Sequence, residues 1–455
     1  MTVVELGVYA LLIAAAGVAV WRRPIVALYL FVVGLALHNA AMAALYAAGV
    51  RGSTLTAIAA WKEILLAVAL VRVGLDGRRA RRLPFAFSLV DALALAFGVL
   101  VVVYALIPQS ALHGAAGHRA VALALRHDLV PVGAYFLGRS LRLRTADVRR
   151  LAWTLLGTAA AVAVGGLVEV YAVPIGWWRG NGVVDYFHRH LGYDYHGTGR
   201  RVEPGGAVYG LPENFIYNVG GDKPFVRRLV STFLSPLGSA YICVVALLLA
   251  AALRRSVLLY ALALGTFAGL LWTFSRSALV ALAVGLLVIA IVRRRPVELG
   301  LAAAVVAIAF AWAHVFPKIG PTGEFTKVDV AYQHRLAAGG DGSSFTATSP
   351  NEPSLSEHWR SLKDGVRTMT HHPQGYGLGN VGQTASRTDT ALKAGESNYT
   401  ELGVELGVLG AILWLAWGLA LLARLVPRAP FVAAAFAAIL ALAVQTNVIG
   451  DPWVA

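Results

Sequence analysis

Long apolar runs, separated by polar connections, extend along most of the chain. A helix needs about 20 mainly apolar residues to cross the hydrocarbon core of a bilayer. The pattern therefore predicts an all-α integral membrane protein with about 12 transmembrane helices. The segments run approximately over residues 3–21, 25–48, 56–75, 85–107, 120–141, 151–173, 229–252, 256–274, 277–292, 297–316, 397–423 and 430–449.

Two long connections interrupt this rhythm. Connections of such length in a compact chain are usually functional or disordered. In the second, "LSEHWRSLKDGVRTM" sets apolar residues at helical spacing beside charged ones, which predicts a short amphipathic helix on the outer surface or over a cavity. The expected parts are amino-terminal transmembrane helices (1–173), a first large loop (174–228), central helices (229–316), a second large loop (317–395) and carboxy-terminal helices (396–455).

Composition and charge agree with a membrane protein. Apolar residues make up 58% of the chain and charged residues 14%, with a mean hydropathy of +0.66. The net charge of +15 does not indicate a nucleic-acid partner, because the basic residues fall in alternate connections. That alternation is the positive-inside pattern, so both large loops are expected to be extracytoplasmic. The single cysteine, Cys243, lies in an apolar segment, which excludes an intramolecular disulfide.

Three arginines stand where the positive-inside pattern expects none. Arg276 lies in the apolar stretch "LLWTFSRSALVAL", and Arg227 and Arg228 precede "LVSTFLSPLGSAY". A charge at the rim of a membrane span marks a candidate site, and guanidinium groups bind phosphate oxygens through paired hydrogen bonds. The sequence therefore predicts an outward-facing anion site, and the alternative that these arginines only cap helices or bind lipid phosphate stays open.

Other charges in apolar segments favour a structural interpretation. Lys62 and Glu63 are adjacent and suit a buried pair between helices. Glu401 and Glu405 share one helix face, and for both a structural role is favoured over chemistry. In "HHPQGYGLGN", Gly375, Gly377 and Gly379 permit positive φ, which predicts a turn that returns the chain to the membrane.

Four motifs now carry a resemblance. In order, "RLVSTFLSPLGSAY", "TFSRSALVALAVGLL", "HWRSLKDGVRTMTHHPQGYGLGN" and "ESNYTELGVELGVLG" resemble the successive motifs of the bacterial O-antigen ligase and polysaccharide polymerase family, over roughly residues 228–410. The resemblance implies a multi-pass glycosyltransferase of the bacterial cytoplasmic (inner) membrane. Its active site would face outward and take glycans from an undecaprenyl-pyrophosphate donor.

The resemblance also carries residue roles. It places the two functional arginines on Arg228 and Arg276, which would stabilise charge on the leaving pyrophosphate. Glu396 stands where the ligases have a histidine, and Ser397 where they have an asparagine. This departure favours a polymerase of surface polysaccharide or exopolysaccharide over a ligase that completes lipopolysaccharide on lipid A-core. Glu396 would act as the general base, and direct displacement would invert the anomeric centre.

The remaining site candidates are expected to bind substrate. They are Arg227, Ser275, Ser397, Asn398, Tyr399, Trp359, His372 and Trp178. Expected partners are membrane lipid, the lipid-linked oligosaccharide donor and a sugar acceptor, and the resemblance leaves a chain-length regulator open. No cofactor and no metal are expected, because the spacing of Asp185, His188, His190, Asp194 and His196 matches no specific metal site.

Two alternatives remain open beside the polymerase. One is an O-antigen ligase that transfers the glycan to lipid A-core or another separate acceptor. The other is a polysaccharide or lipid-linked sugar transporter, which about twelve spans would also suit. Transporters commonly consist of repeated halves with binding groups near the midplane, whereas no internal repeat is evident here.

Overall fold

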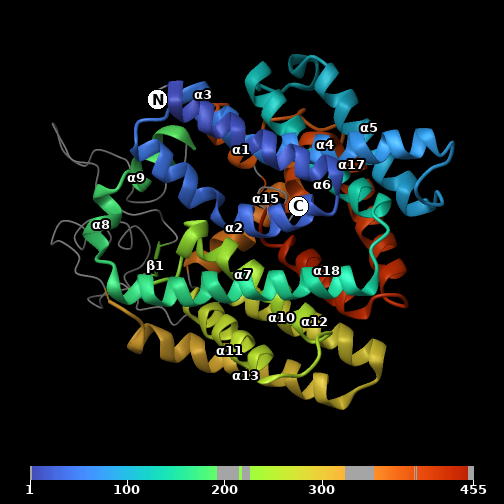
Figure 1. Ribbon diagram of the computed structural model, residues 1–455. Helices are drawn as coiled ribbons and strands as arrows, with labels where there is room; N and C mark the ends of the chain where they lie inside the picture. The colour runs from blue at the N-terminus through green and yellow to red at the C-terminus, as the bar shows by residue number, and fades with distance from the viewer. Residues whose placement is uncertain are drawn as a thin grey trace, which may run out of the picture.

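The computed structural model describes residues 3–191, 215–217, 226–322, 353–393, 395 and 397–448. These parts are almost entirely helical (Figure 1). The amino-terminal half contains α1 (Val3–Arg22), α2 (Val26–Ala47), α3 (Gly52–Ala59), α4 (Trp61–Arg79), α5 (Leu89–Leu106), η1 (Gln109–Leu112), α6 (His118–Ser140), α7 (Thr145–Ala172), α8 (Ile175–Gly180), α9 (Val183–Asp185) and η2 (Tyr186–His190).

The second half begins with two short strands, β1 (Ile216–Tyr217) and β2 (Val226–Arg227), which pair antiparallel. The helices that follow are η4 (Ser231–Phe233), α10 (Pro236–Ala250), α11 (Val257–Trp272), α12 (Arg276–Arg293), α13 (Pro296–Ile319), α15 (Pro353–His371), α16 (Gly382–Arg387), α17 (Asn398–Leu425) and α18 (Pro430–Leu442).

The protein is a mostly helical membrane protein with several candidate spans. Among the described residues, seven helices are long and apolar enough to cross a membrane, or eight if α3 and α4, bent by 41°, form one span. The seven are α2, α5, α6, α7, α12, α13 and α17. Shorter apolar helices lie in Gly7–Arg22, α10, α11 and α18.

The predicted number of twelve spans is therefore not confirmed. Each of the twelve apolar segments contains a helix, but several of these helices are shorter than the segment. The segment 229–252 shows why: its first residues form the 3₁₀ turn η4, and α10 begins only after Ser235, whose hydroxyl accepts the Gly238 N–H. A hydropathy pattern detects apolar residues, but it does not detect the N-cap and proline that set where a helix begins.

Small residues let the helices approach closely, as is common in membranes. A Cβ added to Gly269 of α11 would lie 2.3 Å from the Ala163 Cβ of α7. A Cβ added to Gly285 of α12 would lie 2.4 Å from a Leu248 methyl of α10 and 3.1 Å from the Ala434 carbonyl of α18. Side chains of α7, α10, α11, α12 and α18 accordingly form one buried apolar cluster.

Ion pairs neutralise charges among the amino-terminal helices. The Arg139 Nε of α6 lies 2.8 Å from Asp91 Oδ1 of α5. Glu63 Oε1 lies 3.1 Å from the Arg126 Nε and 3.5 Å from the Lys62 Nζ. The interpretation of Lys62 and Glu63 as a structural pair fits this geometry.

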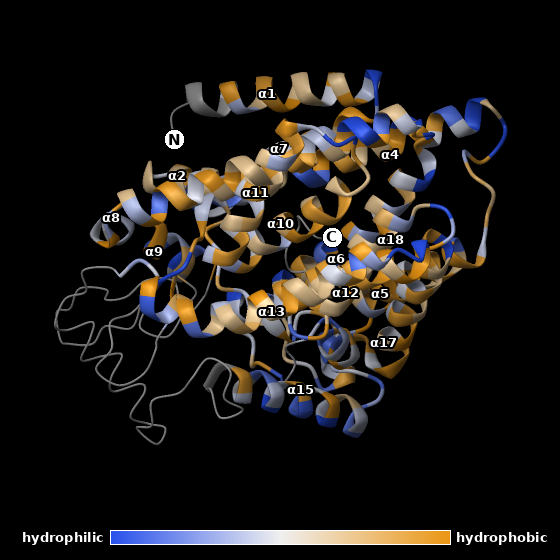
Figure 2. Cartoon of the chain, turned by 90° about the horizontal axis from the view of Figure 1, so that it is seen from below, coloured by the Kyte–Doolittle hydropathy of each residue, from blue (hydrophilic) through white to orange (hydrophobic). Residues whose placement is uncertain are grey.

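Helix α15 lies at the place of the expected amphipathic helix. Figure 2 shows it at one edge of the molecule, with hydrophilic and hydrophobic residues mixed along its length. One face packs on α17, where a Cβ on Gly365 would lie 2.8 Å from Thr400. Leu355, Trp359 and Val366 are exposed on the protein, so these apolar side chains are free to face the membrane interface, as in an amphipathic surface helix.

Candidate functional site

The first two arginine motifs lie side by side in the structure. The Leu229 N–H donates to the Trp272 carbonyl over 3.0 Å, and the Arg228 Nε donates to the Thr273 carbonyl over 2.9 Å. Thr273 is the residue that follows α11, and Arg276 is the first residue of α12. The fold therefore brings Arg228 against the turn that carries Arg276.

That turn is built from hydroxyl side chains and one unusual backbone conformation. The Thr273 hydroxyl donates to the Leu270 carbonyl and accepts the Ser275 N–H. Phe274 has a φ of 49°, which reverses the chain between the two helices. Ser275 is 2% exposed, and its hydroxyl lies 3.3 Å from that of Ser277.

The arrangement suits an anion in two ways. The first turn of α12 presents backbone N–H groups without partners inside the helix, and the helix dipole is positive there. Arg276 lies in this turn, and Arg228 contacts the segment immediately before it. Backbone N–H groups and arginine side chains together bind phosphate oxygens.

Arg227 and Trp178, both expected to bind substrate, are instead held by Glu169. The Glu169 Oε1 accepts the Arg227 Nη2 and the Trp178 Nε1, each over 2.8 Å. Arg227 also donates to the Val173 carbonyl. Both side chains are buried, at 7% and 5% exposed, and their polar groups are engaged by Glu169. Their predicted contact with substrate stays a prediction. Burial lowers the pKa of the Arg227 guanidinium, and the Glu169 carboxylate opposes that shift.

The start of α17 is fixed by polar side chains that had been predicted to bind substrate. The Ser397 hydroxyl accepts the Thr400 N–H over 3.1 Å, and the Thr400 hydroxyl accepts the Ser397 N–H over 3.2 Å, which is a capping box. Asn398 is 1% exposed, and its N–H donates to the Ala443 carbonyl. The Tyr399 hydroxyl donates to the Leu440 carbonyl over 3.1 Å. Glu396 lies outside the described residues.

The glycine-rich turn adopts the positive φ values that its sequence predicts. Gly375, Gly377 and Gly379 have φ of 76°, 89° and 81°. The turn docks on a break in α17 at Gly407, where φ is 73° and ψ is 178°. At this break the Tyr376 N–H donates to the Val404 carbonyl over 2.7 Å.

Glu405 has a structural role at the same junction. Its carbonyl accepts the Gly377 N–H over 2.9 Å, and its Oε1 accepts the Gly379 N–H over 2.8 Å. Backbone groups freed by the break are thus satisfied by the turn, which a membrane interior requires. The structural interpretation of Glu405 fits these contacts.

Next to the turn, His372 belongs to a group of rings. Its ring stacks on Tyr376 at 4.1 Å between centroids and meets His113 edge-on at 5.5 Å. The Lys393 Nζ lies 4.8 Å from the centre of the Tyr376 ring. Rings with polar edges beside a cation can contact both the faces and the hydroxyls of a sugar.

Trp359 lies on α15, far from the rings around His372. It is 59% exposed on α15, with the Lys363 Nζ 5.1 Å from the centre of its ring. His372 follows the end of α15, so thirteen residues at the helical rise separate the two by about 20 Å. Trp359 and His372 therefore cannot contact the same sugar unit.

The loop weighed as a metal site is only partly described. Asp185 pairs with Arg189 over 3.3 Å, and His190 stacks on Tyr186 at 5.5 Å. Burial, and then the positive charges of Arg387 and Arg119, lower the pKa of His190. Asp194, His196 and the side chain of His188 lie outside the described residues. In the described part of the chain, no three histidine, cysteine or acidic side chains have the geometry of a metal site.

Residues 258–415 match the protein-family model described as O-antigen ligase. This match covers about a third of the chain and supports its assignment to the O-antigen ligase and polymerase family. The resemblance drawn from the motifs is thereby confirmed, and the O-antigen ligase region contains Arg276, the glycine-rich turn and the break at Gly407. Arg228 precedes the matched region. A search of curated proteins gave no significant match.

Sequence reasoning missed two residues that organise the site. Glu169 is not among the predicted site residues, although an acidic residue in an apolar segment signals a partner, here Arg227. Thr273 gave no signal for its contact with Arg228, because the group that accepts from Arg228 is its backbone carbonyl.

Proposed function

We propose that this protein is a polymerase-like membrane glycosyltransferase of surface polysaccharide synthesis. It transfers glycans from an undecaprenyl-pyrophosphate donor to a sugar hydroxyl at the outer face of the cytoplasmic membrane. The observation that carries the proposal is the contact of Arg228 with the Thr273 carbonyl, three residues before Arg276. Two arginines from separate motifs thus lie on adjacent segments, beside the start of a helix.

The reaction is a displacement at the anomeric carbon. The acceptor hydroxyl oxygen forms a bond to that carbon, the bond to the pyrophosphate oxygen breaks, and the electron pair leaves with undecaprenyl pyrophosphate. Arg228 and Arg276 stabilise the negative charge that develops on the leaving group. Since attack occurs opposite the leaving group, the anomeric configuration inverts, and no metal is required for the charge.

Glu396 takes the proton from the acceptor hydroxyl. Its neighbour in sequence, Ser397, caps α17, and the next N–H bonds to Ala443 after α18. Leu442 and Ala443 belong to the same buried cluster as Ala278 and Leu279, which lie in the first turn of α12. Because α18 packs on α12, whose first residue is Arg276, the start of α17 is linked to the second arginine motif through α18, which supports Glu396 as the proposed base.

The family assignment favours a transferase over a transporter. Between polymerase and ligase, the glutamate at the position of the ligase histidine favours the polymerase, and no contact among the described residues favours the ligase. The aromatic group around His372 is the proposed place for sugar contacts.

A reconstituted assay tests the proposal. Purified protein in lipid vesicles is supplied with an undecaprenyl-pyrophosphate oligosaccharide, and products are resolved by size. Arg276→Ala, Arg228→Ala and Glu396→Gln are compared with Arg255→Ala, which removes a positive charge from an exposed loop. We expect a ladder of longer lipid-linked products with wild type and with Arg255→Ala, and its loss in the other three. A donor consumed only after a separate acceptor is added would identify a ligase, and a donor never consumed would refute the proposal.

A further inference from the structure

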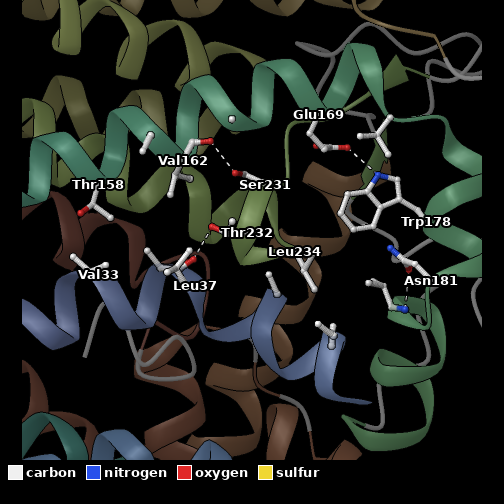
Figure 3. A pocket seen from close by; sticks show the side chains of 18 of the residues that line it. Val33, Leu37, Thr158, Val162, Glu169, Trp178, Asn181, Ser231, Thr232 and Leu234 are labelled. Carbon is white, nitrogen blue, oxygen red and sulfur yellow. Dashed lines mark hydrogen bonds between the residues drawn. The ribbon is translucent and has the colours of Figure 1, made fainter. Parts of the chain in front are cut away.

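A large pocket lies between α2 and α7, and nothing in the proposed chemistry accounts for it. Its volume is about 940 Å³, which is within the range of ligand sites. Figure 3 shows Val33 and Leu37 on α2 facing Thr158 and Val162 on α7, with Ser231, Thr232 and Leu234 between the two helices. We refer to it as the α2–α7 pocket.

The space exists because the facing sides of both helices carry small residues. Ala40 and Ala44 line it from α2, and Gly157, Ala161 and Gly165 line it from α7. A Cβ added to Gly157 or Gly165 would meet no atom within 4 Å. These glycines do not serve close helix packing, as Gly269 does, but leave open volume.

The floor of the pocket carries two hydroxyl side chains, but both donate their protons to backbone carbonyls. The Ser231 hydroxyl donates to the Val162 carbonyl of α7 over 2.8 Å, and the Thr232 hydroxyl donates to the Ala36 carbonyl of α2 over 2.6 Å (Figure 3). Both hydroxyl protons are therefore engaged by backbone groups. Apart from the end lined by Glu169, Trp178 and Asn181, the pocket offers a ligand mainly methyl and methylene groups.

The position of the pocket indicates a lipid chain. Both α2 and α7 are candidate membrane spans, so the pocket lies at membrane depth. Leu37, at 49% exposed, shows that it is open on one side. A water-filled pocket with this lining would be unfavourable, whereas a hydrocarbon chain buries apolar surface there.

The floor also connects the pocket to the arginine motif. Ser231 and Thr232 follow Arg228 after only two residues. Their two hydroxyl hydrogen bonds hold η4 between α2 and α7. At one end of the pocket, Trp178 and Asn181 line it beside Glu169 (Figure 3). A lipid chain in the pocket would thus have its head near the segment that carries Arg228.

We propose that the α2–α7 pocket holds the long isoprenoid chain of the lipid-linked donor. The identity of the chain rests on the proposed function, and continuity of the floor with Arg228 favours the donor over bulk phospholipid. The pocket then selects the donor by its lipid, separately from the arginines that bind its pyrophosphate.

A crosslinking experiment tests occupancy without requiring turnover. The photoreactive residue p-benzoylphenylalanine replaces Leu37 in the pocket or, as a matched control, Leu299 on α13, which is 52% exposed against 49% for Leu37. The full-length protein, in phosphatidylethanolamine and phosphatidylglycerol vesicles containing undecaprenyl phosphate, is irradiated and its mass is measured. We expect a polyprenyl adduct at position 37 and not at 299. Phospholipid adducts alone, equal polyprenyl adducts at both positions, or no adduct at position 37 would overturn the proposal.

A chain-length experiment tests selection. Gly165→Leu fills open volume in the pocket, and Gly300→Leu makes the same change at an exposed position of α13 where an added Cβ also meets nothing within 4 Å. Excluding about two methylene groups of the chain should raise KM for an undecaprenyl-linked donor about tenfold. KM for a donor with a two-isoprene chain should not change, nor should either value in Gly300→Leu.

The outcomes separate the two proposals. Equal KM increases for long and short donors would overturn the pocket assignment while leaving the transferase intact. A polyprenyl adduct at position 37 in a protein that never consumes donor would leave the pocket assignment standing and refute the proposed reaction.

Discussion

Replacing Gly375 by alanine is expected to unlock the glycine-rich turn from α17. A Cβ at this position would lie 2.4 Å from the Gly407 backbone nitrogen and 2.6 Å from the Glu405 carbonyl oxygen. Neither atom is the end of a flexible side chain, so one of the two backbone segments must move. The φ of 76° adds strain for any residue with a Cβ.

The magnitude follows from these two effects. A left-handed conformation costs an L-residue about 1–2 kcal/mol. Displacing the turn also weakens the Tyr376 and Gly377 N–H bonds to α17, and each such hydrogen bond contributes about 1 kcal/mol. The sum is about 3–4 kcal/mol, which for a chain of this size corresponds to a fall in Tm of roughly 3–4 °C.

Thermal unfolding of the purified protein in detergent measures this effect. Gly74→Ala is the matched control, because Gly74 lies within α4 and an added Cβ there meets nothing within 4 Å. That change should leave Tm equal or slightly raised, since alanine favours a helix. A Gly375→Ala variant as stable as wild type would refute the conclusion that the turn and the break in α17 are locked together.

Three further substitutions test the assigned roles. Arg276→Lys should lower kcat by about 10- to 100-fold with little change in Tm, because an ammonium group cannot make the paired contacts of a guanidinium; full activity would count against a pyrophosphate role. Glu169→Leu should destabilise the protein by about 3 kcal/mol, because it leaves the Arg227 charge buried without its partner. The double variant Glu169→Leu and Arg227→Met should lose much less stability, and an equal loss of stability in the single and double variants would contradict a buried ion pair. Tyr399→Phe should lower the stability of the protein by about 1 kcal/mol, because it removes the hydrogen bond to the Leu440 carbonyl. A raised KM would support Tyr399 as a substrate ligand, and an unchanged KM would limit it to this structural contact.

The apolar pattern predicted where helices lie but not how each one begins or bends. Every predicted segment contains a helix because burial of apolar side chains in lipid depends on composition alone. The break at Gly407 could not be located in this way, since it depends on a second segment docking against α17. The spacing of glycines in the turn predicted positive φ values, but it did not predict that the turn packs closely on α17, which makes those values necessary.

The sequence singled out charged residues of the candidate site but could not identify the partner of each one. Arg228 and Arg276 were singled out because charge in an apolar context is costly, and the structure brings their segments together. Arg227 met the same criterion, yet it is paired with Glu169. Sequence shows that a buried charge needs a partner and does not show whether that partner is a ligand or another side chain. Ser397 and Tyr399 likewise satisfy backbone groups that only the packed helices reveal.

Contacts of α18 explain how motifs distant in sequence can act on one substrate. The first motif is joined to the segment of the second by the Leu229 N–H to the Trp272 carbonyl and by the Arg228 side chain to the Thr273 carbonyl. Backbone hydrogen bonds join the third motif to the fourth at Val404 and Glu405. Helix α18 packs on α12, which begins at Arg276, and the Ala443 carbonyl just beyond it holds the first turn of α17. Because α18 contacts both α12 and the start of α17, a change in its packing is expected to move the two motif pairs relative to each other. The proposed base and the proposed pyrophosphate site therefore depend on a helix that contributes no reactive group.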